Sequence, residues 1–207
     1  MDWPVSVALA QSVPGLPTGT DWSYEMKLDG HRMIMWRTGD GVRLQARSGR
    51  DVTAAWGDLA LAGHHLPAGT VLDGEAVITT EDGRVSFEAA QARAASSPTR
   101  ARRLAAQRPA HYIAFDALQL PSGNVRTRPY SERRAALLNL LAEMPANTPI
   151  QAVSPPPTAT PHSPGTPPST TSSASKASSP NVPPPPTGPA APGHGRRSGM
   201  LKLSMPT

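Results

Sequence analysis

The chain has no cysteine among its 207 residues, which excludes a disulfide framework and any metal site built on thiolates. Its six histidines lack the spacing of metal ligands. His64 and His65 are adjacent, so on a strand they would point to opposite faces. No segment approaches the ~20 apolar residues of a membrane-spanning helix, and the N-terminus lacks the basic and apolar regions of a signal peptide. We therefore expect a cytoplasmic protein with no membrane partner.

Acidic and aromatic residues are missing from the C-terminal part of the chain. All nine aromatic residues precede position 131 and all fifteen acidic residues precede position 144, whereas fifteen of the 25 prolines lie at or after position 151. Such a composition cannot bury enough apolar surface to offset the entropy of ordering. The sequence therefore predicts a folded domain at 1–150 and a disordered, Pro/Ser/Thr/Ala-rich tail at 151–207, which is a candidate ligand for an SH3-like partner.

The excess of positive charge belongs mostly to this tail. The domain at 1–150 has 16 Lys/Arg and 15 Asp/Glu, and the tail adds four cations and no acid, which gives the formal net charge of +5. The basic character of the whole chain is therefore weak evidence for a nucleic-acid partner. Two groups of arginines inside the domain are better candidates for phosphate contact, although a solvated face is the alternative for each: Arg100, Arg102, Arg103 and Arg108, and then Arg126 and Arg128.

The most informative residue is Lys27, which lies in a short apolar run directly before an Asp-Gly turn signal. A lysine becomes a nucleophile when it is desolvated or placed beside other cations, and Arg32 is close in sequence. Alternation along a strand at 22–28 would place Glu25, Lys27 and Asp29 on one face. The alternative is a surface hairpin with a solvated lysine.

Hydrophobic periodicity and turn signals predict a mixed set of elements. Because strands and helices do not alternate strictly, the sequence predicts an α+β domain. Helix 131–143 is expected to begin with Ser131 as its N-cap. The expected strands are 22–28, 32–37, 42–47, 70–79 and 111–119, and the expected helices are 55–62, 86–95 and 131–143.

Five short motifs follow one another along the domain. They read KLDGHR at 27–32, ARSGRDVT at 46–53, VLDGEAV at 71–77, YIAFDAL at 112–118 and RPYSERR at 128–134. In this order they resemble motif I, the S-R-x-G-x-D-x-T segment, motif III, motif IIIa and the next helix of the covalent nucleotidyltransferases, a family of ATP-dependent DNA ligases, RNA ligases and mRNA capping enzymes. Ala46 stands where serine is usual. The second and fifth segments favour the bacterial ATP-dependent DNA ligases.

This resemblance implies a fold and a nucleophile. The fold would be an ATP-grasp-like nucleotidyltransferase domain, the adenylation domain of a DNA ligase, in which antiparallel sheets with flanking helices surround an ATP cleft. Lys27 would attack the α-phosphate of ATP to form lysyl-AMP and release pyrophosphate. Asp29 and Gly30 would orient the loop that carries the lysine.

The resemblance also implies a set of nucleotide-binding residues. Arg32 and Arg47 would bind phosphate and ribose, and Glu75 would hold the ribose hydroxyls or a water on Mg²⁺. Phe115 would stack on adenine, and Glu25 would accept a hydrogen bond from the adenine amino group. Taken alone, Phe115 fits equally well as a core aromatic residue, and Arg47 as a surface cation.

The sequence departs from the family pattern after the domain. No segment resembles motif IV, and no OB-fold follows. Around Lys202 there is a faint similarity to motif V, with Met200 where tryptophan is common and Ser204 in place of a second lysine. We interpret this as a truncated or frameshifted adenylation domain. A motif IV encoded in another reading frame across 151–199 would support this interpretation, and its absence from all three frames would contradict it.

These observations favour an ATP-dependent DNA ligase that seals nicks in double-stranded DNA with ATP and Mg²⁺, acting as a monomer in repair and recombination. Two alternatives stay open. One is another covalent nucleotidyltransferase, of the RNA ligase or capping type. The other is a non-catalytic nucleotide-binding remnant whose Pro-rich tail binds a partner, a reading favoured by the missing motif IV.

Overall fold

A computed structural model of the chain describes residues 1–8, 23–154 and 201–204, with only the backbone described for Tyr24 and for 201–204. All of these residues belong to one compact unit. The strands are β1 (Ser23–Met26), β2 (His31–Arg37), β3 (Val42–Ala46), β4 (Thr70–Ile78), β5 (Ala110–Leu120), β6 (Gly123–Asn124), β7 (Ile150–Ala152) and β8 (Leu201–Ser204). The helices are α1 (Gly57–Gly63), α2 (Phe87–Ala94), α3 (Pro98–Gln107) and α4 (Tyr130–Ala142), with a 3-10 turn at Thr53–Ala55.

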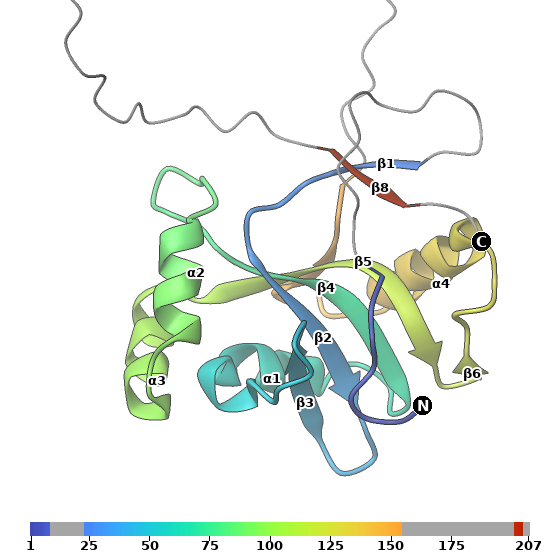
Figure 1. Cartoon of the computed structure of the whole chain (residues 1–207), viewed down its shortest axis with the longest axis horizontal. Coiled ribbons are helices and arrows are strands. Elements are labelled where there is room, and N and C mark those ends of the chain that lie inside the picture. Colours follow the sequence, from blue (N-terminus) through green and yellow to red (C-terminus); the bar gives the residue numbers. More distant parts are fainter. Residues whose placement is uncertain (9–22, 155–200, 205–207) are drawn as a thin grey trace, which may run out of the picture. The chain divides into compact units, whose positions relative to one another are not determined.

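An antiparallel sheet with flanking helices forms the centre of the domain (Figure 1). Its strand order is β3-β2-β4-β5-β6, and β7 pairs parallel to β5. A separate two-stranded antiparallel ladder joins β1 to β8. This architecture is α+β, as the sequence predicts. Within the described residues, no helix is long and apolar enough to span a membrane.

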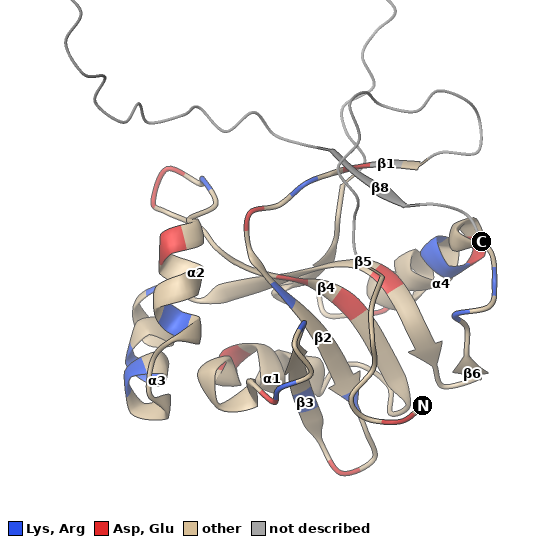
Figure 2. Ribbon diagram, in the orientation of Figure 1, with Lys and Arg blue, Asp and Glu red and all other residues tan. Residues whose placement is uncertain are grey.

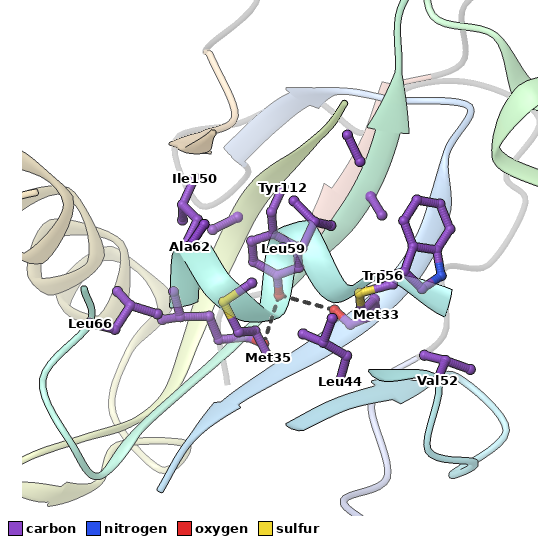
Figure 3. Close-up of a cluster of buried hydrophobic side chains, with 14 of the residues drawn as sticks. Met33, Met35, Leu44, Val52, Trp56, Leu59, Ala62, Leu66, Tyr112 and Ile150 are labelled. Carbon is purple, nitrogen blue, oxygen red and sulfur yellow. Dashed lines mark hydrogen bonds between the residues drawn. The ribbon is translucent and has the colours of Figure 1, made fainter. Parts of the chain in front are cut away.

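The sheet is covered on both faces, which explains why β2 reads as a continuous apolar run over 33–36. On one face, Met33 and Met35 pack with residues of β3, β4 and β5 beneath helix α1 (Figure 3). On the opposite face, Ile34 and Trp36 form a smaller cluster with Val5 of the N-terminal segment. The remainder of that second face carries polar residues of β2 and β4.

Two register shifts interrupt the pairing of β4 with β5. At the shift between Asp73 and Gly74, Asp73 is opposite Asp116 and Gly74 is opposite Ala114, so Phe115 is the extra residue of a β-bulge. A bulge bends its strand and changes the direction of a side chain. The bulge therefore sets the direction of Phe115 independently of the regular alternation along β5.

A buried tyrosine fixes the centre of the sheet. The Tyr112 hydroxyl lies 3.0 Å from the carbonyl oxygen of Met33 and 2.9 Å from that of Leu72, and it donates toward them. Burial raises the pKa of this phenol well above its usual value, and the nearby Asp73 carboxylate adds to the effect. A Cβ at position 74 would lie 2.7 Å from the tyrosine ring, so Gly74 provides the space that the ring occupies.

A charged group is buried beneath the sheet between α1 and α2. Arg93 of α2 is 1% exposed and pairs with Asp58 of α1, and its guanidinium lies 4.7 Å from the Trp56 ring centroid. The same arginine donates to the Ala55 carbonyl at 3.1 Å, and Asp58 accepts from the backbone N–H of Ala110 at 3.0 Å. The pair therefore joins α1, α2 and β5.

Trp56 also stacks on His31, with ring centroids 5.8 Å apart and planes 26° apart. The His31 Nε2 atom is buried and has no hydrogen-bond partner among the described residues. Burial lowers the pKa of His31 below its usual 6.5, and the charge of Arg50 lowers it further. Folding therefore favours the neutral imidazole.

This lowered pKa predicts that the domain loses stability as the pH falls. An unfolded chain binds a proton at His31 near pH 6.5, whereas the folded chain resists it, so the free energy of unfolding falls as the pH drops below about 6.5. We expect His31→Gln to lose less stability than the unmodified chain between about pH 7.5 and pH 5.5. Urea unfolding at several pH values measures this difference. Equal losses in both proteins would contradict the assignment.

The elements expected from the sequence agree with those observed to within two residues, with specific exceptions. The first strand ends at Met26, two residues before the expected end. Helix α4 begins at Tyr130 with Pro129 in the N-cap position, so the prediction that Ser131 is the N-cap is wrong. Helix α3 is not predicted, because its single buried residue, Ala101, produces no apolar period. Strand β7 is missed because it is short and is stabilised by its pairing with β5.

Candidate active site

The connection between β1 and β2 carries Lys27. Because β1 ends at Met26, the alternation expected over 22–28 does not reach the lysine: Glu25 is buried, whereas the side chain of Lys27 is 44% exposed. The Lys27 Nζ donates to Asp29 Oδ1 at 2.6 Å. The structure thus presents a solvent-accessible amine whose position is restrained by a carboxylate two residues away.

Glycine is required where this connection meets the sheet. The backbone N–H of Gly30 donates to Glu75 Oε2 at 3.3 Å. A Cβ at position 30 would lie 2.6 Å from the carbonyl oxygen of Ala76 and 2.8 Å from a methyl group of Val77, both on β4. Close packing of the loop on β4 therefore depends on Gly30. This packing brings Glu75 beside the loop that carries Lys27.

Arg32 is held in place from two sides. Its Nε and one terminal nitrogen donate to both oxygens of Asp73, at 3.1 and 2.7 Å, and the other terminal nitrogen donates to the Ala8 carbonyl at 2.7 Å. The guanidinium carbon lies 5.4 Å from the Phe115 ring centroid. Arg32 is also opposite Glu75 in the β2–β4 ladder. Figure 2 shows both signs of charge on β2 and β4 here.

The guanidinium of Arg32 keeps its positive charge in this environment. Burial lowers the pKa of its guanidinium, but the hydrogen bonds to Asp73 and the charges of Asp73 and Glu75 raise it more, so the net pKa is above its usual value. Sequence reasoning did not select Asp73 as a site residue, although it lies in the same VLDGEAV motif as Glu75. The bidentate pair shows that Asp73 sets the orientation of Arg32.

A second group of contacts connects β1, β5 and α4. Glu25 is 4% exposed, and Phe115 and Tyr130 are 6% exposed. The Tyr130 hydroxyl donates to Glu25 and also lies 3.4 Å from the Phe115 carbonyl oxygen. Burial raises the pKa of Tyr130, and the hydrogen bond to Glu25 raises it further, so the phenol keeps its proton. Sequence reasoning missed Tyr130, which stands within the RPYSERR motif.

Two of the residues expected at the site are not joined to it by these contacts. Arg47 lies exposed in the turn after β3, and its side chain forms no hydrogen bond or ion pair with the described part of the chain. The backbone of Lys202 pairs with Glu25 across β1 and β8, but the Lys202 side chain lies outside the described residues. Within the described ranges, no three His, Asp or Glu side chains are grouped to hold a metal ion.

Comparison with known proteins identifies the family of the chain. A family model described as the ATP dependent DNA ligase domain matches residues 8–156. DNA ligase C of Mycobacterium tuberculosis is 45% identical over 137 residues, which are 66% of this chain and 37% of that protein. DNA ligase C2 of Mycolicibacterium smegmatis is 43% identical over 141 residues, which are 68% of this chain and 39% of that protein. The chain thus spans about two fifths of the length of these curated relatives.

Solved structures agree with the sequence comparison. The ligase domain of Mycobacterium tuberculosis LigD is similar with a TM-score of 0.53 and 30% identity, over 66% of this chain and 41% of that one. A mycobacterial DNA ligase D, solved in complex with ATP and MES, has a TM-score of 0.51 and 32% identity, over 64% of this chain and 40% of that one. The family model covers well over half of the sequence, and the fold is the one that its motifs imply. The chain belongs to the ATP-dependent DNA ligase domain family.

Proposed function

We propose that this chain performs the adenylation chemistry of an ATP-dependent DNA ligase, as the family requires for sealing nicks in DNA repair. The observation that carries the proposal is the position of Lys27. Its amine is exposed, restrained by Asp29 at 2.6 Å, and placed on a loop that is hydrogen-bonded to Glu75. Such an arrangement suits a lysine that must meet a nucleotide from solvent.

The first step transfers AMP from ATP to Lys27. The ammonium loses a proton, for which Asp29 Oδ1 is the nearest acceptor, and the nitrogen lone pair attacks the α-phosphorus. A P–N bond forms, the bond from the α-phosphorus to the bridging oxygen of the β-phosphate breaks, and pyrophosphate leaves with that electron pair. Phosphoryl transfer depends mainly on positioning and charge neutralisation, and the charged Arg32 supplies one cation near the loop.

The later steps consume the adduct. The 5′-phosphate of nicked DNA attacks the phosphorus of lysyl-AMP, the P–N bond breaks, and Lys27 recovers a proton. The 3′-hydroxyl at the nick then attacks the DNA phosphate, which forms the phosphodiester and releases AMP. Double-stranded DNA with a nick is therefore the proposed substrate, and we place the reaction in the cytoplasm, with the chain acting as a monomer.

Adenine binding requires a local change at Phe115. Its ring is 6% exposed, and the Arg32 guanidinium lies over it at 5.4 Å. We propose that Arg32 moves from the ring toward the phosphates when ATP binds, while adenine takes its place on Phe115. Base stacking on an aromatic ring contributes ~1–3 kcal/mol in nucleic-acid complexes. Glu25 then accepts from the adenine amino group, and Arg47 contributes a further cation once the nucleotide is bound.

The donor set suits Mg²⁺ that arrives with the nucleotide. Mg²⁺ keeps several waters and is commonly bound by one or two carboxylates together with substrate phosphates. Glu75 is half-buried beside the Lys27 loop and can hold such a hydrated ion or the ribose hydroxyls. When bound, the ion neutralises charge on the phosphate oxygens. Lys202 is proposed to assist at the same phosphates, because its backbone pairs opposite Glu25.

The domain organisation is part of the proposal. We propose an adenylation domain over 1–150, completed by the pairing of β7 and β8 with its strands, and a tail over the rest of 151–207 that is available to a protein partner. The family model extends to residue 156, and β7 continues the domain to Ala152. Both observations support a boundary close to the start of the proline-rich sequence.

The direct test uses the full chain with α-labelled ATP and Mg²⁺, followed by unlabelled duplex with a single 5′-phosphorylated nick. The expected result is label on the protein, its transfer to the DNA 5′ end, and conversion of the nicked strand to the sealed length. Label that stays on the protein would support nucleotidyl transfer alone. Absence of label from a folded chain would contradict the proposal.

Helix α3 supplies a prediction about the DNA substrate. Arg100, Arg102 and Arg103 are exposed, and no acidic residue occurs between Glu88 and Asp116. Figure 2 shows basic and no acidic colouring on this helix. Each phosphate contact changes the slope of log K against log salt concentration by about 0.9. We expect replacement of the three arginines by glutamine to reduce the slope for nicked duplex by about 2 to 3.

The matched control removes the same charge from the tail, as Lys176→Gln, Arg196→Gln and Arg197→Gln. Binding is measured by fluorescence anisotropy between about 50 and 200 mM salt, the range over which counterion release is readily resolved. If both triple variants reduce the slope equally, net charge and not the α3 surface is responsible. Formation of the AMP adduct is expected to be equal in all three proteins.

A further inference from the structure

We propose that Tyr130 is a positioning residue for base selection: its hydroxyl holds the Glu25 carboxylate in the orientation that accepts from the 6-amino group of adenine. The inference deepens the proposed function and rests on it. Tyr130 is the first residue of α4 and lies 105 residues from Glu25 in sequence. Tyr130 lies outside the set of nucleotide-binding residues that the family resemblance implies.

The Tyr130 hydroxyl contacts Glu25 in a buried setting. Glu25 and Tyr130 are both buried, at 4% and 6% exposure, and the phenol donates to Glu25 Oε1. The same hydroxyl lies 3.4 Å from the carbonyl oxygen of Phe115. The Tyr130 side chain therefore contacts both Glu25, the proposed acceptor for the adenine amino group, and the backbone of Phe115, the proposed stacking residue.

The Tyr130 ring is itself held in place. The Arg133 guanidinium lies 5.7 Å from the Tyr130 ring centroid. Arg133 also donates to both oxygens of Asp116, each at 3.0 Å, and Asp116 directly follows Phe115 on β5. The first turn of α4 is thus fixed to β5 at the bulge, so Tyr130 presents its hydroxyl to Glu25 from a rigid support.

Hydrogen-bond chemistry links this orientation to the choice of base. An ionised carboxylate can only accept, which suits the amino group at C6 of adenine and opposes the carbonyl at C6 of hypoxanthine. Without the Tyr130 hydroxyl, the Glu25 carboxylate loses the donor that fixes its orientation and can rotate away from the adenine amino group. Discrimination between the two bases is therefore expected to depend on Tyr130.

The test compares ATP and ITP, which differ at C6 of the base. Affinity of each for the full chain with Mg²⁺ is measured by titration calorimetry, with Lys27→Ala as the parent so that no adduct forms. We expect the parent to prefer ATP, and Tyr130→Phe to reduce the ATP:ITP affinity ratio by about tenfold, the size of effect expected for a hydrogen bond to a charged group. ITP affinity itself should change less than twofold, a limit set well below that tenfold effect.

Tyr112→Phe is the matched control. It also removes one buried tyrosine hydroxyl, but that hydroxyl is hydrogen-bonded to the backbone carbonyls of Met33 and Leu72 in the core and not to Glu25. It should lower thermal stability and leave the ATP:ITP ratio unchanged. If the ATP:ITP ratio changes in both variants, the effect of Tyr130→Phe comes from general loosening of the fold, and the proposal is overturned.

A second variant, at Glu25, keeps the proposal testable if Tyr130→Phe does not fold. Glu25→Gln should lower the same ratio, and adding Tyr130→Phe to it should lower the ratio no further, since the hydroxyl acts through Glu25. An unchanged ratio in folded Tyr130→Phe, or a parent with no preference for ATP, would overturn the inference. If selectivity is present and depends on Tyr130 while the unmodified chain forms no AMP adduct, the adenylation proposal fails and this one stands.

Discussion

Replacement of Lys27 by alanine is expected to abolish the covalent AMP adduct, a loss of at least about a thousandfold, because no group at the same position can attack the phosphorus. Lys27→Arg should be equally inactive: it keeps the positive charge, but a guanidinium does not deprotonate in proteins. Incubation with α-labelled ATP followed by a denaturing gel measures the adduct.

Lys176→Ala is the control for the loss of a lysine, and it should label like the unmodified chain. The P–N bond between the protein and AMP offers a further check, because a phosphoramidate is labile in acid and stable in base. Label that persists in Lys27→Ala would assign the nucleophile elsewhere. Retained binding of ATP by Lys27→Ala, measured by calorimetry, would separate loss of chemistry from loss of the fold.

The largest effect on stability is expected at Arg93. Its guanidinium is 1% exposed, pairs with Asp58 and lies over Trp56, so removing it leaves the Asp58 carboxylate, which is 24% exposed, without its ion pair. Breaking a fully buried ion pair from one side costs about 3–5 kcal/mol, and the partial exposure of Asp58 places the expected loss at the lower end of that range. Since small domains have only about 5–15 kcal/mol of stability in total, Arg93→Ala should shift the urea midpoint strongly downward.

Exposed Arg103 on the neighbouring helix provides the comparison. Arg103→Ala should change stability by less than about 0.5 kcal/mol, as is usual for surface positions. A cycle of Arg93→Ala and Asp58→Ala separates the ion pair from lost packing: the double variant should be less destabilised than the sum of the two single ones. Full additivity would show that packing against Trp56, and not the charge pair, makes Arg93 important.

Much of the fold follows from local patterns, and the contacts within the site do not. The apolar run at 33–36 and the alternation in β5 give strands at almost their observed bounds. The Lys27 loop is evident because an Asp-Gly turn directly follows an apolar run. In contrast, the pairing of Arg32 with Asp73 joins residues 41 apart, and that of Tyr130 with Glu25 joins residues 105 apart.

The direction of Phe115 shows why sequence alone is insufficient. Simple alternation along β5 would assign its face from that of Tyr112, but a bulge at Phe115 interrupts the count. Nothing local in the YIAFDAL segment predicts that extra residue, because it arises from the fit of β5 against β4. Burial of Glu25 depends in the same way on α4, which covers it only after the chain has folded.

The stack of His31, Trp56 and Arg93 makes Trp56 an intrinsic fluorescent probe of its surroundings. Indole emission is quenched by a protonated imidazole in contact with it, and His31 is the imidazole that faces Trp56, at 5.8 Å between ring centroids. Emission from Trp56 should therefore follow the protonation of one histidine. Fluorescence can thus report, without any attached dye, the protonation state of the residue that begins the strand next to Lys27.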